Sequence, residues 1–153
     1  MIVFTKATSN DAEQLVQIQL NAFSIDVELC GEGPPGYDSA ERQIELMKSH
    51  SYYKITDEKR IIGGFYIYQK DKGCYDIVRL FIDPSYQGKG IGSMVLSYIE
   101  ELFDDVKVIE LEASDFRKDN HRFYENRGYT KVGKKEYSEG CFSYLYRKML
   151  DSR

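Results

Sequence analysis

The stretch Val78–Leu96 constrains the fold more than any other part of the chain. Its first residues, Val78–Ile82, form a mostly apolar run with β-branched side chains, which predicts a buried strand. Asp83–Ser85 then marks a turn, because proline cannot continue the hydrogen-bond ladder of a strand. Beyond a glycine-rich segment, apolar residues recur at helical spacing over 91–103. The stretch therefore predicts a strand, a tight turn and a glycine-rich entry to a helix.

The glycine-rich segment favours an anion-binding site. The first N–H groups of a helix have no intrahelical partner and carry the positive end of its dipole. Glycines remove the side chains that would keep a bulky anion from the backbone, and Lys89 adds positive charge. A flexible turn that happens to contain glycines is the alternative. We expect a diphosphate to bind at Gln87, Gly88, Lys89, Gly90, Ile91, Gly92 and Ser93.

Two common phosphate-binding loops fit this segment poorly. The nucleoside-triphosphate loop needs four residues between its first glycine and a Gly-Lys-Ser/Thr, and that spacing is absent. The dinucleotide fingerprint needs a glycine where Ser93 stands, although Glu110 and Glu112 lie where a ribose-binding acid would be expected. A nucleotide-binding domain thus remains a weak alternative, which parallel titrations with NAD and acetyl-CoA would test.

A third pattern fits without a gap. The spacing Gln87-x-x-Gly90-x-Gly92 resembles the acetyl-CoA-binding motif of the GNAT superfamily of N-acetyltransferases, Gln/Arg-x-x-Gly-x-Gly/Ala. The segment Phe123–Tyr129 also resembles the Phe-Tyr-Glu-x-x-Gly-Phe/Tyr segment near the end of that domain. With both motifs, the resemblance extends over essentially the whole chain.

The resemblance implies an α/β (α+β) fold, in which a mixed, mostly antiparallel sheet of about seven strands is flanked by about four helices. It also implies acetyl-CoA as co-substrate. The pantetheine arm would enter between two splayed parallel strands, along Leu80, Phe81 and Ile82. Many family members contact the cofactor through an Asn where this chain has Arg117. Asn120, closer to Tyr124, is the candidate that we retain for this contact.

The resemblance further implies the catalytic groups. Tyr124 occupies the position of the family's general acid, near the thioester sulfur, and a buried structural tyrosine is the alternative. Asp76 lies where several family members place a glutamate that receives the amine proton. Because Asp is shorter by one methylene, we expect it to act through water. His121, Glu28 and Glu32 are further candidates for the base.

Composition limits the class of protein. At 153 residues, 42% hydrophobic and 30% charged, the chain fits one globular domain over 1–153. A net charge of −4 without a basic stripe argues against nucleic acid, and no apolar run approaches a membrane span. Three widely spaced cysteines argue against a disulfide framework and against a zinc site, so we expect no metal. The cytoplasm is the expected location, and a homodimer stays open.

Periodicity and turn residues predict the remaining elements. Helices are expected from about Ala12 to Phe23, from Ala40 to about Lys48 after Ser39 as N-cap, and over Lys118–Asn126 with Gly128 as C-cap. Ser24–Asp38 is expected to be a loop. The expected strands are Ile2–Ala7, Tyr52–Asp57, Ile61–Lys70 with a bulge at Gly63-Gly64, Tyr75–Ile82, Val106–Ala113, Tyr129–Tyr137 and Cys141–Met149.

The segment 26–45 carries six acids and one arginine. A solvated surface and a rim that attracts a cationic amine are the two interpretations. We therefore expect transfer of acetyl from acetyl-CoA to a small cationic amine by direct attack, without a cysteine intermediate. The alternatives are a non-catalytic acyl-CoA-binding or sensor domain and an acyltransferase that uses a longer acyl-CoA.

Overall fold

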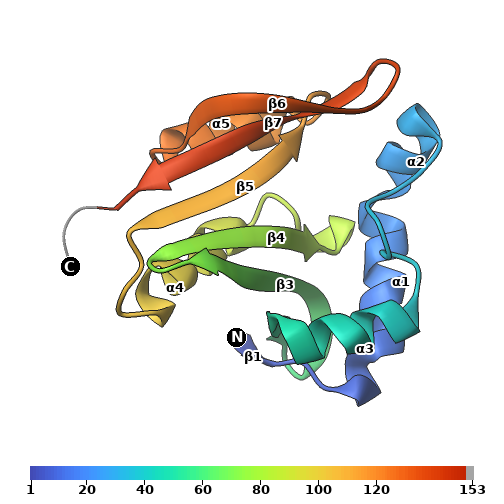
Figure 1. The fold of residues 1–153 in the computed structure, drawn as a ribbon. Coiled ribbons are helices and arrows are strands. Elements are labelled where there is room, and N and C mark those ends of the chain that lie inside the picture. Colours follow the sequence, from blue (N-terminus) through green and yellow to red (C-terminus); the bar gives the residue numbers. More distant parts are fainter. Residues whose placement is uncertain (151–153) are drawn as a thin grey trace.

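The fold is built on a mixed seven-stranded sheet in the computed structural model, which describes residues 1–150 (Figure 1). The strands follow the order β1-β2-β3-β4-β5-β7-β6, and β4–β5 is the parallel pair among antiparallel neighbours. The strands are β1 (Ile2–Lys6), β2 (Ser51–Asp57), β3 (Arg60–Asp71), β4 (Cys74–Ile82), β5 (Val108–Ser114), β6 (Thr130–Ser138) and β7 (Cys141–Met149). This confirms the predicted class of sheet.

Helices pack on both faces of the sheet. They are α1 (Ala12–Ala22), α2 (Ser24–Cys30), α3 (Ala40–Ser49), α4 (Ile91–Leu102) and α5 (Lys118–Asn126), with the short 3-10 helices η1 (Ser9–Asp11) and η2 (Pro84–Tyr86). One core packs the apolar side of α4, including Val95 and Leu96, against the sheet. The other packs α1 and α3 against Tyr52, Tyr66 and Phe81. No helix within residues 1–150 is long and apolar enough to span a membrane.

The sequence predicted several helix and strand ends correctly. Ser39 caps α3, because its hydroxyl accepts a hydrogen bond from the Arg42 amide at 3.1 Å. Gly128 follows α5 with a φ of 94°, as expected of a C-cap glycine. The bulge expected near Gly63 is also present, since the β2–β3 register shifts next to its partner Ile55.

Two expectations about the chain from Ser24 onward are wrong. Its first part is the helix α2 rather than a loop, which brings the α-helices of the described residues to five, where about four were expected. Moreover, Cys30 at the end of α2 forms a disulfide with Cys141 at the start of β7. The fold brings together cysteines that are 111 residues apart, and Cys74 alone is a free thiol in residues 1–150.

The parallel strands β4 and β5 separate along their length. Their pairing runs from Cys74↔Val108 to Ile77↔Leu111 and ends there, although β4 continues to Ile82 and β5 to Ser114. The family resemblance predicted this separation. At their carboxyl ends, β4 and β5 therefore do not hydrogen-bond to each other. Such a gap in a sheet is where a ligand can bind backbone groups.

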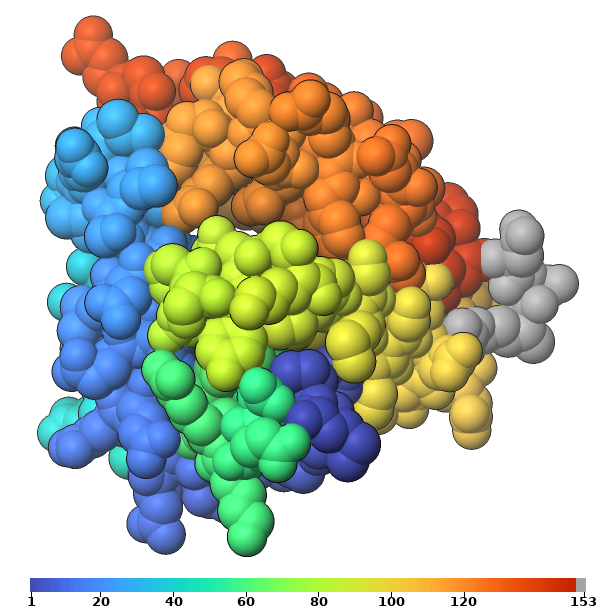
Figure 2. All heavy atoms as spheres, turned by 180° about the vertical axis from the view of Figure 1, so that it is seen from behind, coloured from blue at the N-terminus to red at the C-terminus, as the bar shows by residue number. Residues whose placement is uncertain are grey.

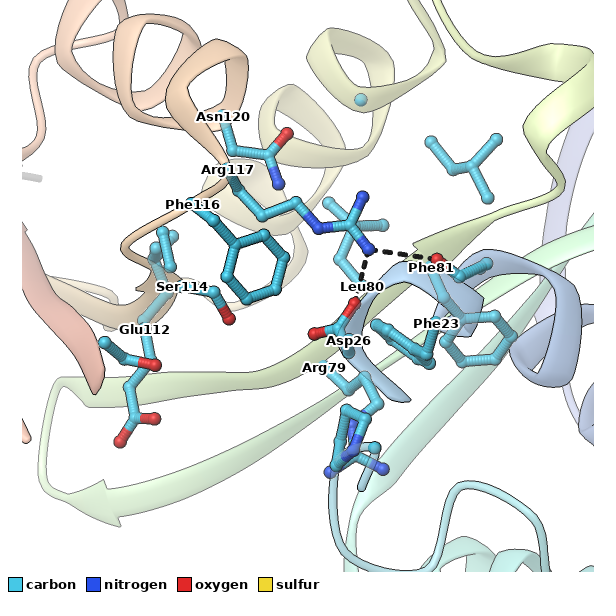
Figure 3. Close-up of a pocket in the computed structure, with 18 of the residues that line it drawn as sticks. Phe23, Asp26, Arg79, Leu80, Phe81, Glu112, Ser114, Phe116, Arg117 and Asn120 are labelled. Carbon is cyan, nitrogen blue, oxygen red and sulfur yellow. Dashed lines mark hydrogen bonds and ion pairs between the residues drawn. The ribbon is translucent and has the colours of Figure 1, made fainter. Parts of the chain in front are cut away.

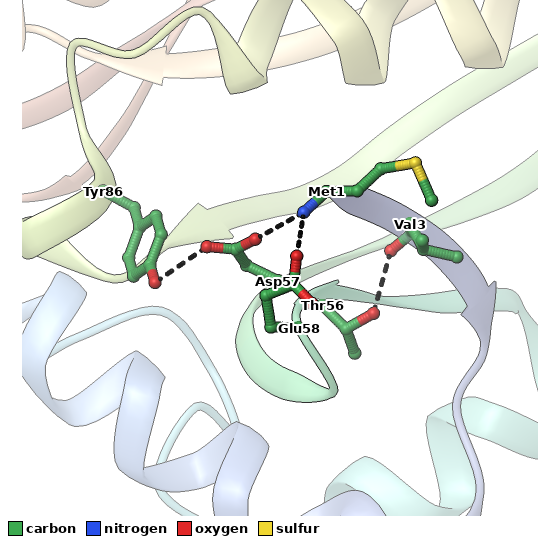
Figure 4. A network of polar contacts seen from close by, with 6 residues as sticks. All are labelled: Met1, Val3, Thr56, Asp57, Glu58 and Tyr86. Atoms are coloured by element: carbon green, nitrogen blue, oxygen red, sulfur yellow. Dashed lines mark hydrogen bonds and ion pairs between the residues drawn. The ribbon is translucent and has the colours of Figure 1, made fainter.

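A polar network fixes the turn after β4 (Figure 4). The Tyr86 hydroxyl donates to Asp57 at 3.1 Å, and the same carboxylate accepts from the Met1 amino group at 2.9 Å. Within the turn, Asp83 accepts from the Ser85 amide at 2.9 Å. These bonds hold η2, and with it the start of the glycine-rich loop, against the β2–β3 turn.

Candidate active site

A cavity of about 910 Å³ occupies the gap between β4 and β5. In the space-filling view, a hollow lies between the yellow-green segment around β4 and the orange segment of β5 and α5 (Figure 2). The glycine-rich loop and α5 line one part of it, while α2 and the β6–β7 hairpin line another. The cavity therefore extends from the start of α4 to the Cys30–Cys141 disulfide, whose two residues both line it.

The predicted strand wall is present. Leu80, Phe81 and Ile82 all line the cavity, and the facing wall is the end of β5, Leu111–Ser114. Phe81 is almost fully buried, whereas its two neighbours are partly accessible. Because β4 has no partner on this side past Ile77, its backbone groups there can pair with an extended ligand.

The glycine-rich loop presents unbonded amides. Gly88 and Gly90 have φ values of 78° and 80°, and Gly90 forms the N-cap of α4. Within residues 1–150, the backbone amides from Gly88 to Ser93 donate to no backbone or side-chain acceptor. A Cβ on either positive-φ glycine would meet no protein atom within 4 Å, so the space beside the loop is open. The loop thus has the free donors and the space that a diphosphate needs.

Most of the predicted loop residues line the cavity. They are Gln87, Gly88, Gly90, Ile91, Gly92 and Ser93, and Asn120 lines it from α5. Lys89 is exposed and lies outside the lining, with its ammonium 5.3 Å from the centre of the Tyr86 ring. The Gln87 side chain donates to the Ile82 carbonyl at 3.3 Å, which ties the loop to the end of β4.

Tyr124 lies beside this loop because α5 packs on the start of α4. A Cβ on Gly92 would be 3.2 Å from the Phe123 ring, so this glycine permits the close approach. Tyr124 lines the cavity, and its hydroxyl makes no hydrogen bond with the described residues. Desolvation raises the pKa of Tyr124 to about 12, so the phenol stays protonated at neutral pH.

Asp76 lies outside the cavity lining, although it faces the same side of the sheet as several residues of that lining. It pairs with Tyr68 on β3 and with Glu110 on β5. Burial, and then the nearby charges of Glu112 and Glu110, raise the pKa of Asp76 to about 6, against the opposing effect of Lys70. The carboxyl therefore titrates close to neutrality.

The other proposed bases are placed differently. His121 is buried, its Nε2 lies 2.7 Å from the Ser114 carbonyl, and it is not part of the cavity lining. Glu28 also lies outside the lining, whereas Glu32 is part of it. Glu112 on β5 lines the cavity too and accepts a hydrogen bond from the Tyr137 hydroxyl. From the sequence, Glu112 was expected only as a ribose-binding acid of the nucleotide-binding alternative.

Of the two interpretations of the acid-rich segment 26–45, the structure favours a solvated surface over a rim of the cavity. Of its six acids, Asp26 and Glu32 line the cavity, and Asp26 is neutralised by Arg117, whose Nη2 lies 2.6 Å from its Oδ1 (Figure 3). Asp38 borders a separate depression, and Glu41 lines neither. The charge of the segment is therefore not concentrated on the cavity, because α2 and α3 direct most of these acids elsewhere.

Two arginines of the cavity were not predicted as site residues. Arg117 also donates to the Ala22 carbonyl at 3.0 Å and so connects α5 to the end of α1. Arg79 lines the cavity from β4, next to the wall formed by Leu80. In Figure 3, Arg117 and Asn120 lie on the α5 side, the Arg79 side chain runs from β4 away from these two residues, and Glu112 lies on β5.

A model of the acetyltransferase (GNAT) family matches residues 13–129, most of the chain. The chain therefore belongs to this family. It is an acetyl-CoA-dependent N-acetyltransferase, and its fold and its open loop at the start of α4 agree with that class. Acetyl-CoA is the co-substrate of the family.

Individual relatives are distant in sequence. The S-(2-succino)cysteine N-acetyltransferase of Bacillus subtilis (strain 168) is 25% identical over 154 aligned residues, covering 94% of this chain and 93% of that protein. Among solved structures, the PaiA N-acetyltransferase of Thermoplasma acidophilum in complex with coenzyme A has a TM-score of 0.79 at 16% identity, covering 98% and 99% of the two chains. The ribosomal-protein-S18-alanine N-acetyltransferase of Escherichia coli also has a TM-score of 0.79, at 13% identity, covering 100% and 96%. At these identities, the structural likeness supports the fold alone.

Proposed function

We propose that this chain acetylates the primary amine of a small acceptor that is cationic before it reacts. Acetyl-CoA would place its diphosphate on the amides of Gly88–Ser93 and its thioester in the gap beyond Ile77. The observation that carries the proposal is the single cavity that joins these free amides to the Tyr124 hydroxyl. The Bacillus relative is named for a small amine acceptor, which agrees with an acceptor of this size.

The acceptor would enter from the opposite part of the cavity, between α2 and the β6–β7 hairpin. Glu32 and Glu112 lie in this part of the lining and supply negative charge for an ammonium group. The attraction would thus come from two acids of the lining rather than from the whole acid-rich segment 26–45. The amine would then meet the thioester beside Leu80, where unpaired backbone N–H groups of β4 can stabilise the oxyanion.

Proton movements must balance the transfer. An amine with a pKa of about 10.4 is neutral in only roughly one molecule in a few thousand at pH 7, so a base must take its proton. The nitrogen then attacks the thioester carbonyl carbon, and the C–S bond breaks as the tetrahedral intermediate collapses. Tyr124 gives its proton to the departing sulfur, whose thiol has a pKa of about 8.5. As the amide forms, the attacking nitrogen loses a second proton, and this proton returns the Tyr124 phenolate to the phenol. The products are the N-acetylated amine, free coenzyme A and the one proton held by the base.

For the base, we propose Asp76 acting through water. Its pKa of about 6 suits a group that must be ionised at neutral pH and still accept a proton. Glu112 is the rival because it belongs to the cavity lining itself. The pH profiles of the amide variants of each residue distinguish the two, since burial raises the pKa of Asp76 toward neutrality.

An amine panel with thiol release as the readout tests the proposal. The panel contains spermidine, an aminoglycoside, S-(2-succino)cysteine, several free amino acids and an N-terminal peptide, with product masses measured for every hit. We expect turnover of at least one small amine and none of the peptide. A Tyr124→Phe variant that binds acetyl-CoA serves as the matched control. Binding of acetyl-CoA without turnover of any amine would instead favour a non-catalytic acyl-CoA-binding or sensor domain. A preference for a longer acyl-CoA over acetyl-CoA would favour an acyltransferase that uses a longer acyl group.

A further inference from the structure

Arg79 is a partly buried cation of the cavity lining that no carboxylate of residues 1–150 neutralises. Its side chain is half-buried, and desolvation lowers the pKa of its guanidinium. No carboxylate oxygen lies within 4 Å of it in residues 1–150, whereas Arg117 of the same cavity is paired with Asp26. A partly buried arginine is normally paired, because an unpaired charge loses hydration without compensation.

A structural role accounts for only part of the Arg79 side chain. Its Nη1 donates to the Pro35 carbonyl at 3.1 Å, and the guanidinium lies 5.5 Å from the centre of the Tyr66 ring. These contacts orient the planar group and use one of the N–H donors of an arginine, which number about five. The loop that carries Pro35 is also held by Gln43, whose side chain donates to the Gly36 carbonyl at 2.8 Å. The loop thus has an anchor besides Arg79.

The region around Tyr137 presents both signs of charge. The Tyr137 hydroxyl donates to Glu112, and the charges of Arg79 and Asp76 both act on the same phenol. An ammonium at the Glu112 side and a carboxylate at the Arg79 side would each find an opposite charge. A polyamine would leave Arg79 unpaired and would add a second cation beside it.

We propose that Arg79 binds a carboxylate of the acceptor, and that the acceptors of this site are therefore amino acids rather than polyamines. The inference rests on the proposed function, because it assigns the acceptor end of the same cavity. Arginine and carboxylate form bidentate, charge-assisted hydrogen bonds, which a neutral amide at the same position cannot replace. Arg79 thus determines which acceptors bind, whereas other residues transfer the protons.

The test compares acceptors that differ only in charge. S-carboxymethylcysteine and methionine are each assayed against the corresponding carboxamides, with spermidine alongside, and rates are expressed per neutral amine. For the wild type we expect kcat/KM to be ~100-fold higher for the acids than for the carboxamides. Arg79→Gln should remove this preference by lowering kcat/KM for the acids alone, and Arg79→Lys should restore part of it. The KM for acetyl-CoA should stay unchanged.

Arg122→Gln is the matched control, because Arg122 on α5 is an exposed arginine that is paired with Asp119 at 3.0 Å. It should leave the preference for acids intact. Equal turnover of acids and carboxamides by the wild type, or an equal loss of both in Arg79→Gln, would overturn the inference while leaving the acetyltransferase proposal standing. If Arg79→Gln does not fold, the wild-type comparison still decides.

If no amine is acetylated, the proposed function fails and the inference is decided by binding. The acids and their carboxamides are then titrated into the protein saturated with coenzyme A, with the wild type and Arg79→Gln compared by calorimetry. Tighter binding of the acids to the wild type alone would support the carboxylate contact at Arg79. Equal binding of acid and carboxamide would overturn it.

Discussion

At the scale of single residues, the Tyr124 hydroxyl is the group on which acetyl transfer should depend most. It faces the cavity without a hydrogen-bond partner in the described chain, and its pKa of about 12 keeps it protonated. We expect Tyr124→Phe to lower kcat by ~100-fold or more, because the sulfur would leave without a proton donor. The dissociation constant of acetyl-CoA, measured by calorimetry, should change little. An unchanged kcat would show that water or another group protonates the thiolate.

Asp76 should set the acid limb of the pH profile. Because its pKa is raised to about 6, the carboxyl loses its proton as the pH rises through that value and only then can accept one. We expect kcat/KM to rise with pH up to about 6, and this limb to disappear in Asp76→Asn along with most of the activity. Glu112→Gln is the comparison variant. A limb that persists in Asp76→Asn but vanishes in Glu112→Gln would reassign the base.

The same pKa predicts a dependence of stability on pH. The unfolded carboxyl has a pKa of 3.8 and the folded one about 6, so the native state binds more protons between these values. Stability contributed by Asp76 is thus full below about pH 4 and is lost as the pH rises through 6. Allowing for solvent screening, Asp76→Asn should stabilise the protein by about 1–2 kcal/mol at pH 7.5 and hardly at pH 4. Urea unfolding at both pH values measures this, and equal effects at both would contradict it.

At the scale of elements, the sequence predicts strands better than it predicts which way their side chains point. The seven strands appear within a few residues of their predicted ends, because alternation and turn residues mark them locally. Another bulge, at Val78, is not apparent in the sequence: Tyr66 pairs with Arg79 and Ile67 with Ile77. Simple alternation would put Arg79 opposite to Asp76, whereas the bulge puts both on one face. Arg79 was therefore missed as a site residue.

The glycine-rich loop offers a prediction about conformation. Gly90 is the N-cap of α4 with a φ of 80°, which L side chains adopt at a cost of roughly 1–2 kcal/mol. We expect Gly90→Ala to lose about that much stability and to raise the KM for acetyl-CoA ~10-fold or more, since its methyl group would enter the space beside the free amides.

Gly140 provides the matched control for this substitution. It has a φ of 78° in the β6–β7 turn, and a Cβ there would also meet nothing within 4 Å. Gly140→Ala should cost similar stability in thermal unfolding and leave the KM for acetyl-CoA unchanged. If both variants raised that KM equally, general loosening of the fold would explain the effect better than the loop.

At the scale of the whole molecule, the proposed cofactor half of the site was predictable from the sequence and the proposed acceptor half was not. The loop, the splayed strands and Tyr124 belong to contiguous motifs, so local sequence places them. The acceptor half joins residues from distant parts of the chain, such as Asp26 with Arg117 and Glu112 with Tyr137. No short sequence motif contains both members of such a pair. In addition, the segment that forms α2 was predicted to be a loop. The disulfide is the extreme case, because only the fold brings its cysteines together.

The disulfide should stabilise the molecule and fix the acceptor end of the cavity. It links α2 to β7 across 111 residues, and closing so long a loop lowers the entropy of the unfolded chain by an amount worth up to about 4–5 kcal/mol. We expect Cys141→Ser to lower the melting temperature by roughly 5–15 °C. Because both cysteines line the cavity, the KM of the acceptor should rise while that of acetyl-CoA stays near its original value.

Dithiothreitol should reproduce both effects in the wild type and none in Cys141→Ser, and Cys74→Ser serves as the free-thiol control. A wild-type protein that melts at the same temperature with and without reductant would show that the bond contributes nothing to the fold.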